Sequence, residues 1–283
     1  RPAAYHNARL NAPNVFELDL DESLVERAAS LFDRALAPTL ASDPSLGHRR
    51  HTLQTHSDGT YFVMRPPGWN SDIAWVSADD EQSLQSLGAL FDEARIGSHL
   101  GAVIPHDSCI QMYSAFFVVR SRCEAPKPHC DYVDAVGTGA MTLITPLANY
   151  ASAHGDEGFE LLYAQSDVPA TERGSSIKAF TQYRYQKGRA ICFGSHFWHS
   201  TEPGASVQPR AYLCFTFGTD RQALWPGIAE TLCTYQSRVV RRPDGSLELT
   251  QLGEYLEREE ADGAVRRMER EHTEGVGDSI FVG

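Results

Sequence analysis

The stretch KGRAICFGSHFWHSTEPGASVQPRAYLCFTFGT, residues 187–219, decides the fold of this chain. Two runs rich in β-branched and aromatic residues, RAICF and RAYLCFTF, flank a segment of Gly, Ser, Pro and His, which is typical of strands separated by turns. His199 lies at the end of one expected strand and Arg210 at the start of the next, with ten residues between them. The segment therefore predicts β-structure that carries an imidazole and a guanidinium on neighbouring strands.

The same pattern extends over most of the preceding sequence. From residue 109 onward, short runs of this kind are separated by Gly, Pro, Asn and Asp, as in CIQMYSAFFVVRSR, AMTLITPLANY, GFELLYAQ and SSIKAFTQYRYQ. No helical segment of useful length interrupts them up to residue 219, which argues against parallel βαβ units and favours an antiparallel sandwich or barrel. We therefore expect a mainly β fold.

Helical periodicity is confined to the two ends of the chain. Apolar spacing predicts helices within 21–40 and 79–95, with a short strand at 60–65 between them. After the core, VVRRPDGSLEL predicts a hairpin and 252–272 a charged helix. The expected organisation is one domain over 1–283, with N-terminal support in 1–108, the core in 109–219, and the hairpin and helix in 220–283. The helices are expected to flank the sheets.

Composition and charge limit the classes of partner. The 283 residues are 42% hydrophobic, enough for one large buried core, and 25 basic against 37 acidic residues give a net charge of -12. Such a charge repels nucleic acid and anionic membranes, which leaves a small molecule or a peptide as the expected partner. We expect a soluble, cytoplasmic protein. Because the chain opens on Arg1, a removed targeting segment and an organelle stay open.

The cysteines do not form a recognisable site. Six are scattered along the sequence without a C-x-x-C pair, so neither a zinc knuckle nor a disulfide scaffold is indicated. We expect them to be reduced thiols, and the two within RAICF and RAYLCFTF to be buried as small hydrophobic residues.

A candidate metal site begins at PHCDYVD, residues 128–134, where His129 and Asp131 stand two apart. On a strand such residues point to the same face, where His199 from an opposing strand can meet them. Two imidazoles and one carboxylate leave three positions open on an octahedral Fe(II) ion. A zinc hydrolase uses similar ligands but would not need Arg210. His196 competes with His199 for the second imidazole, and Asp134 competes with Asp131.

These residues, with the G-x-x-x-x-F-x-x-x-x-x-H frame from Gly188 to His199, resemble the Fe(II)/2-oxoglutarate-dependent oxygenase superfamily, nearest its phytanoyl-CoA hydroxylase-like branch. The likeness spans 109–219. It implies a double-stranded β-helix (jelly-roll, cupin-like) core and Fe(II) on His129, Asp131 and His199. It also implies 2-oxoglutarate and O₂ as co-substrates, with Arg210 on the far carboxylate of the 2-oxo acid.

The resemblance implies an enzyme that hydroxylates, desaturates or cyclises an unactivated C–H bond of a small metabolite, with no catalytic residue beyond the metal centre. A peptidyl, prolyl-type hydroxylase and a non-catalytic cupin-like binding protein are the alternatives. Tyr212 replaces a Ser or Thr that the family often carries. Further contacts are expected from two groups of side chains. For 2-oxoglutarate these are Tyr212, Thr142, Gln111 and Tyr113; for the substrate they are Trp198, His196 and Arg184.

Overall fold

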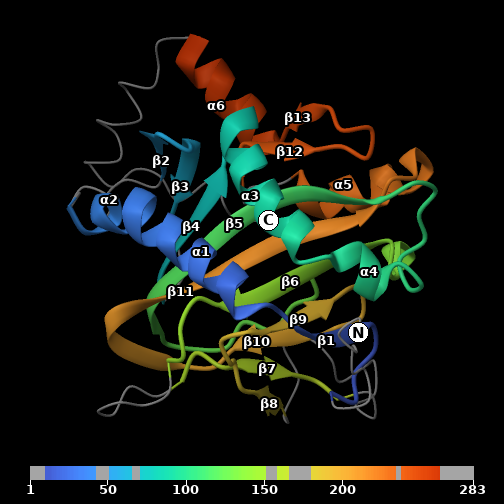
Figure 1. Cartoon of the computed structure of the whole chain (residues 1–283), viewed down its shortest axis with the longest axis horizontal. Helices are drawn as coiled ribbons and strands as arrows, with labels where there is room; N and C mark the ends of the chain where they lie inside the picture. Colours follow the sequence, from blue (N-terminus) through green and yellow to red (C-terminus); the bar gives the residue numbers. More distant parts are fainter. Residues whose placement is uncertain are drawn as a thin grey trace.

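The computed structural model describes residues 10–42, 51–65, 71–150, 158–165, 180–233 and 237–261. In this part of the chain, an eight-stranded sheet has the order β1-β9-β6-β11-β5-β4-β3-β2, and a smaller sheet has the order β10-β7-β8 (Figure 1). Every pairing within both sheets is antiparallel. The core strands are β5 (Ile110–Cys123), β6 (Ala140–Pro146), β7 (Leu161–Tyr163), β8 (Thr181–Tyr183), β9 (Arg189–Phe193), β10 (His199–Thr201) and β11 (Gly204–Thr219).

The chain winds between the two sheets in the order of a double-stranded β-helix. After β6 in the large sheet, β7 and β8 lie in the small sheet; β9 returns to the large sheet, β10 to the small one and β11 to the large one. An isolated bridge between His129 and His199 adds a further segment beside β10. The predicted fold class, mainly β with flanking helices around a jelly-roll core, is confirmed.

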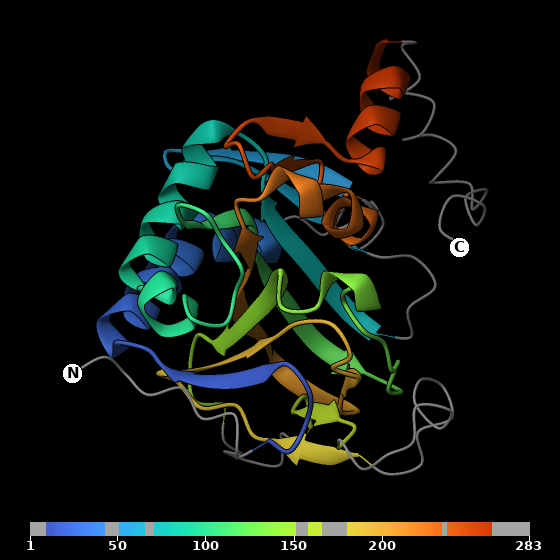
Figure 2. The same ribbon diagram turned by 90° about the vertical axis from the view of Figure 1, so that its right-hand side faces the viewer.

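Helices cover one face of the large sheet. The helix α1 (Glu22–Leu31) continues through η2 (Phe32–Leu36) into α2 (Ala37–Ser42), and α3 (Glu81–Glu93) packs beside it (Figure 2). The ring of Phe32 contacts Phe117 of β5, and the ring of Phe91 contacts Phe215 of β11. Both predicted N-terminal helices are therefore present, and they leave the opposite face of β5 and β11 to line a site.

Several elements were not predicted from the sequence. The strand β1 (Val15–Asp19) pairs with β9 at one end of the large sheet, while β2 (His51–His56) and β4 (Ser71–Ala78) extend the other end beside β3 (Gly59–Met64). Only the last residue of β1 is exposed, so the strand lacks the alternation by which a half-buried strand is recognised. The short helices α4 (Ile96–Leu100) and α5 (Trp225–Leu232) were also missed.

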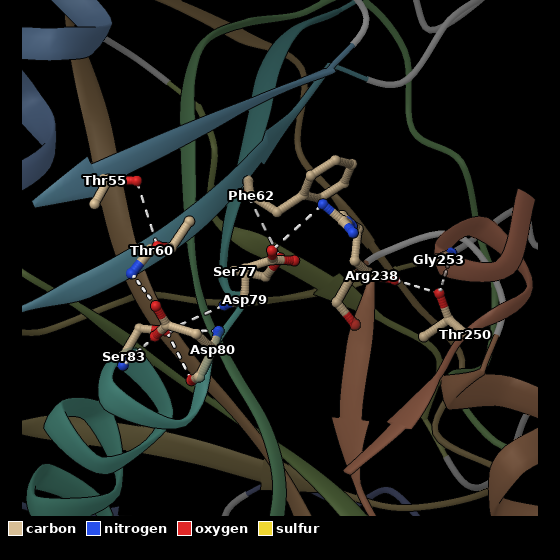
Figure 3. Close-up of polar contacts among 11 residues, drawn as sticks. Thr55, Thr60, Phe62, Ser77, Asp79, Asp80, Ser83, Arg238, Thr250 and Gly253 are labelled. Carbon is tan, nitrogen blue, oxygen red and sulfur yellow. Dashed lines mark hydrogen bonds and ion pairs between the residues drawn. The ribbon is translucent and has the colours of Figure 1, made fainter. Parts of the chain in front are cut away.

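The predicted C-terminal hairpin is present as β12 (Val239–Arg241) and β13 (Leu247–Leu249). It is followed by α6 (Gln251–Ala261), and the rest of the predicted charged helix lies outside the described residues. Figure 3 shows how the hairpin is attached: Arg238 forms an ion pair of 3.6 Å with Asp79, which follows β4. The Arg238 carbonyl accepts a hydrogen bond from the Thr250 N–H, which joins the two ends of the hairpin. Both side chains of the ion pair are largely buried.

The structure also bears on the cysteines and on membrane-spanning helices. None of the six cysteines forms a disulfide, and Cys192 and Cys214 are buried in the strands that carry them. Within the described ranges, no helix combines the length and the apolar character needed to cross a membrane.

Candidate metal centre

His129 and His199 are joined through their backbones. Each N–H donates to the carbonyl of the other at 3.0 Å, which makes one antiparallel bridge. His129 and Asp131 were predicted to lie on a regular strand, but His129 forms a single bridge and Asp131, two residues later, lies in a bend. Pro126 and Pro128 precede the bridge and lack the N–H that a longer ladder would need. The bend, not strand alternation, turns the Asp131 carboxylate toward the two rings.

The two imidazoles present the same ring nitrogen to Asp131. Nδ1 of His129 lies 2.8 Å from the Lys127 carbonyl, and Nδ1 of His199 lies 3.1 Å from the Phe197 carbonyl. Because a carbonyl only accepts, each neutral ring carries its proton on Nδ1 and keeps a free lone pair on Nε2. These Nε2 atoms lie 3.5 Å and 3.6 Å from Oδ1 of Asp131. Two lone pairs and a carboxylate oxygen thus converge, as a divalent metal ion requires.

The other carboxylate oxygen of Asp131 is held by hydrogen bonds. Thr142 Oγ1, on β6, donates to Oδ2 at 2.7 Å, and the Tyr132 hydroxyl lies 3.2 Å from the same Oγ1. Since the Thr142 proton is used on Asp131, the Tyr132 hydroxyl donates to Thr142. Burial raises the pKa of Tyr132 well above its usual value, so the hydroxyl keeps that proton. The chain Tyr132–Thr142–Asp131 fixes the carboxylate and leaves Oδ1 toward the imidazoles.

The environment keeps His199 neutral. Its side chain is buried against the rings of Phe193 and Phe197. Burial and, to a smaller extent, the neighbouring His129 together lower the pKa of His199 to about 4, against the opposing effect of Asp131. A neutral imidazole is the form that binds a metal. The nitrogen and carboxylate donors of His129, Asp131 and His199 all lie within 4.8 Å of one another, so the three residues fit a metal centre.

The three donors face a cavity of about 490 Å³ between the two sheets. The large sheet contributes side chains of β4, β5, β6 and β11, and the small sheet contributes residues of β7 and β10. Much of the wall is aromatic: Trp75, Phe116, Tyr132, Phe159, Tyr185 and Tyr212. A volume of this size fits a small molecule and an aromatic wall favours apolar parts of it.

The alternatives to two of the predicted ligands pair with each other instead of joining the cluster. His196 Nδ1 lies 3.1 Å from Asp134 Oδ1, and both side chains are substantially exposed. His196 also has a φ of 65°, which turns its side chain away from the strand that begins at His199. The geometry therefore favours His199 and Asp131 over these competitors.

Arg210 is buried but is not part of the cavity wall. Its guanidinium donates to the Gly158 carbonyl at 2.8 Å and lies over the rings of Phe159 and Tyr150, at 4.9 Å and 5.7 Å from their centroids. Phe159, which lines the cavity, has a φ of 67° and follows Gly158 with a φ of 89°. A Cβ on Gly158 would lie 2.0 Å from the Pro203 carbonyl oxygen. This tight turn sets the Phe159 ring against Arg210, whose predicted role stays a prediction.

Among the other predicted contact residues, Tyr212 and Thr142 line the cavity and five do not. Tyr113 donates its hydroxyl to the Thr219 carbonyl at 2.7 Å and packs on Trp225, and the Gln111 amide donates to the Met112 carbonyl. Arg184 is exposed and directly follows β8 of the small sheet. The residues that lie off the cavity wall are Gln111, Tyr113, Trp198, His196 and Arg184.

The sequence analysis missed Arg120, which lines the cavity from β5. It is the direct register partner of Arg210 on β11, so the two guanidinium groups start from the same level of the sheet. The sequence contained only a weak indication of this role, namely an arginine at the end of the apolar run SAFFVVR. Such an arginine is equally typical of a strand whose end reaches solvent.

Comparison with known proteins gives distant likenesses. No family model matches the sequence, and no curated protein matches it. HygX from Streptomyces hygroscopicus, solved with nickel and 2-oxoglutarate bound, is 11% identical over 74% of this chain and 84% of that one, with a TM-score of 0.49. A Pseudomonas putida prolyl-4-hydroxylase is 15% identical over 75% and 94%, with a TM-score of 0.43.

A third solved structure is SnoN, described as a non-heme alpha-ketoglutarate-dependent epimerase from nogalamycin biosynthesis. It is 14% identical over 74% of this chain and 80% of that one, with a TM-score of 0.45. At these identities and scores the likenesses carry no information on activity, which has to be inferred from the site itself.

Proposed function

We propose that this protein is an Fe(II)- and 2-oxoglutarate-dependent dioxygenase that hydroxylates, desaturates or cyclises an unactivated C–H bond of a small metabolite. The observation that carries the proposal is the convergence of Nε2 of His129, Nε2 of His199 and Oδ1 of Asp131 at the wall of a cavity that is lined in part by aromatic side chains. Two imidazoles and one carboxylate with open positions are the ligand set of non-heme Fe(II) oxygenases.

The protein residues would divide the work as follows. His129, Asp131 and His199 would bind the iron, and the Lys127 and Phe197 carbonyls would hold the two rings in the ligating tautomer. Bound iron with 2-oxoglutarate and O₂ supplies the oxidising power, coupled to release of succinate and CO₂. The cavity would exclude bulk water and place one C–H bond of the substrate toward the ligand cluster.

A small metabolite is the preferred substrate because of the size of the cavity. The cavity volume of about 490 Å³ lies within the range of small-molecule sites. Its size leaves room for a second small molecule beside 2-oxoglutarate. The chain's net charge of -12 disfavours a nucleic-acid substrate. Membership of the phytanoyl-CoA hydroxylase-like branch is part of the same proposal and rests on the sequence frame from Gly188 to His199.

The test is an anaerobic titration with Fe(II) and 2-oxoglutarate, followed by a screen for succinate release in air. One Fe(II) per chain and succinate release stimulated by a small metabolite, but not by proline-containing peptides, is the expected result. Stimulation by peptides alone would indicate a peptidyl hydroxylase. Iron binding without turnover in any condition would indicate a cupin-like binding protein, and a preference for zinc with hydrolysis would overturn the oxygenase class.

A further inference from the structure

We propose that Arg120, together with the hydroxyls of Tyr185 and Tyr212, binds the far carboxylate of the 2-oxo acid. The inference rests on the proposed function and identifies the cation of that site. It assigns to β5 a role that the sequence analysis gave to Arg210 on β11.

Arg120 continues the strand alternation that places Phe116 and Val118 on the cavity wall, and a β-bulge follows it directly. Arg120 pairs with Ile73 and Arg122 with Asp72, so Ser121 is an extra residue in β5 opposite β4. Ser121 donates to one oxygen of Asp72 at 2.6 Å, and Arg65 donates to the other at 2.7 Å. Bulges beside active sites redirect side chains, and this one separates Arg120, on the cavity wall, from the exposed Arg122.

The guanidinium of Arg120 is available to a ligand. Among the described residues, no carboxylate lies within ion-pair distance of it, because the nearest acid on the neighbouring strand, Asp72, is bonded to Ser121 and Arg65. Arg120 is half-buried and lines the cavity. A partly desolvated guanidinium with no counter-ion binds a carboxylate strongly, through two parallel hydrogen bonds.

Two tyrosine hydroxyls accompany Arg120. Tyr185 and Tyr212 line the same cavity, with ring centroids 4.9 Å apart, and neither hydroxyl has a hydrogen-bond partner among the described residues. Burial raises the pKa of both hydroxyls, so both stay protonated donors. The positive charge of Arg120 is the strongest effect that lowers the pKa of each tyrosine, and at Tyr212 it is larger than the effect of Arg210. One forked cation and two O–H donors form a complete binding set for a carboxylate.

The charge of the wall also favours an anion. Among the described lining residues, the only carboxylate is that of Asp131, a proposed metal ligand, whereas Arg120 and Lys127 are both cationic. This wall therefore has an excess of positive charge in a chain of net charge -12. Arg210, by contrast, is committed to the Gly158 carbonyl and to the Phe159 ring.

The test compares two 2-oxo acids of equal length, 2-oxoglutarate and 2-oxopentanoate, which lacks the far carboxylate. Calorimetry is performed anaerobically on the Fe(II)-loaded protein and on Arg120→Met, Arg120→Gln, Arg210→Met and Arg122→Met, after Fe(II) stoichiometry has shown that each variant is folded. The wild type is expected to prefer 2-oxoglutarate by about 10- to 100-fold, the contribution of charge-assisted hydrogen bonds. Both Arg120 variants are expected to bind the two acids equally, and Arg122→Met is expected to keep the full preference.

A preference that survives in both Arg120 variants would overturn the assignment, and its loss in Arg210→Met alone would give the role to Arg210. Failure of the proposed function has a different signature. In that case the wild type would bind Fe(II) but neither acid, or would bind Fe(II) no better than His199→Ala does, and the role of Arg120 would fall with it.

Discussion

Thr142 Oγ1 donates a hydrogen bond of 2.7 Å to Oδ2 of Asp131, from β6 of the large sheet to the bend that carries the carboxylate. Thr142→Val removes this donor without a change of volume, which frees the carboxylate to rotate and leaves Tyr132 without its acceptor. We expect Fe(II) affinity to fall by about 10-fold, as for other hydrogen-bond partners of metal ligands. Competition with a chelator measures it. Thr142→Ser, which keeps the hydroxyl, should bind as the wild type does; equal affinity in Thr142→Val would mean that the bond does not orient Asp131.

The two histidines of HFWH should differ sharply in metal binding. His199→Ala removes a buried ligand whose Nε2 faces Asp131, so stoichiometric Fe(II) binding should be lost. His196→Ala removes only an exposed contact to Asp134 and should retain one Fe(II) per chain. Metal content after anaerobic loading and desalting distinguishes them. Retention of iron in His199→Ala and its loss in His196→Ala would reverse the ligand assignment.

Asp220 should make stability depend on pH in the acid range. Burial, the largest single effect, raises its pKa, but the backbone N–H groups of Asp107, Cys109 and Ser108 together outweigh it and lower the pKa to about 2. A carboxyl whose folded pKa is depressed contributes stability above its unfolded pKa of about 4, and this is lost as pH falls toward 2.

Asp220→Asn should therefore lower the free energy of unfolding by about 1 kcal/mol at pH 7, allowing for solvent screening of a partly exposed group. The difference from the wild type should shrink between pH 4 and pH 2. Urea unfolding across this range measures it, and a difference that is independent of pH would show that the three bonds do not favour the ionised form.

The ion pair in Figure 3 should be important for attachment of the C-terminal hairpin. Arg238→Met would leave the Asp79 carboxylate largely buried without its cation, at a cost of about 3 kcal/mol in the free energy of unfolding. Arg122→Met, which breaks the exposed pair with Glu124, should cost less than about 1 kcal/mol. Thermal and urea unfolding of both variants measure the contrast. Equal losses would mean that burial of the Asp79 pair adds nothing.

Local patterns in the sequence were sufficient to predict the antiparallel core and the ligand cluster. The residue types and the spacing of His129, Asp131 and His199 along the chain were enough to recognise the cluster. The long run of short β-rich segments, with no helix between them, was enough to exclude parallel βαβ units. The assumed geometry of the first two ligands was nevertheless wrong. They lie on a bridge and a bend, and the two prolines that end the ladder were visible but were not used.

The wall of the cavity was harder to predict, because it depends on register. Arg120 alternates with Phe116 and Val118 on the face of β5 that lines the cavity, and that face is identified only by the pairing of β5 with β4 and β11. Register can also place a side chain away from the cavity, as it does for Tyr113. It falls at the register shift between β5 and β11, and its hydroxyl reaches the Thr219 carbonyl, not the cavity.

The reciprocal bond between His129 and His199 has a further consequence for how the protein would respond to loading with metal. In the part of the chain that the structure describes, this one bridge is the only β-pairing of the segment 124–133. An ion bound to both rings would act as a cross-link that closes the barrel, so occupancy and barrel closure would be thermodynamically linked. Amide exchange in this segment should then slow as iron is added, and the gain in stability should reach about 2.7 kcal/mol at a free metal concentration of 100 times the Kd.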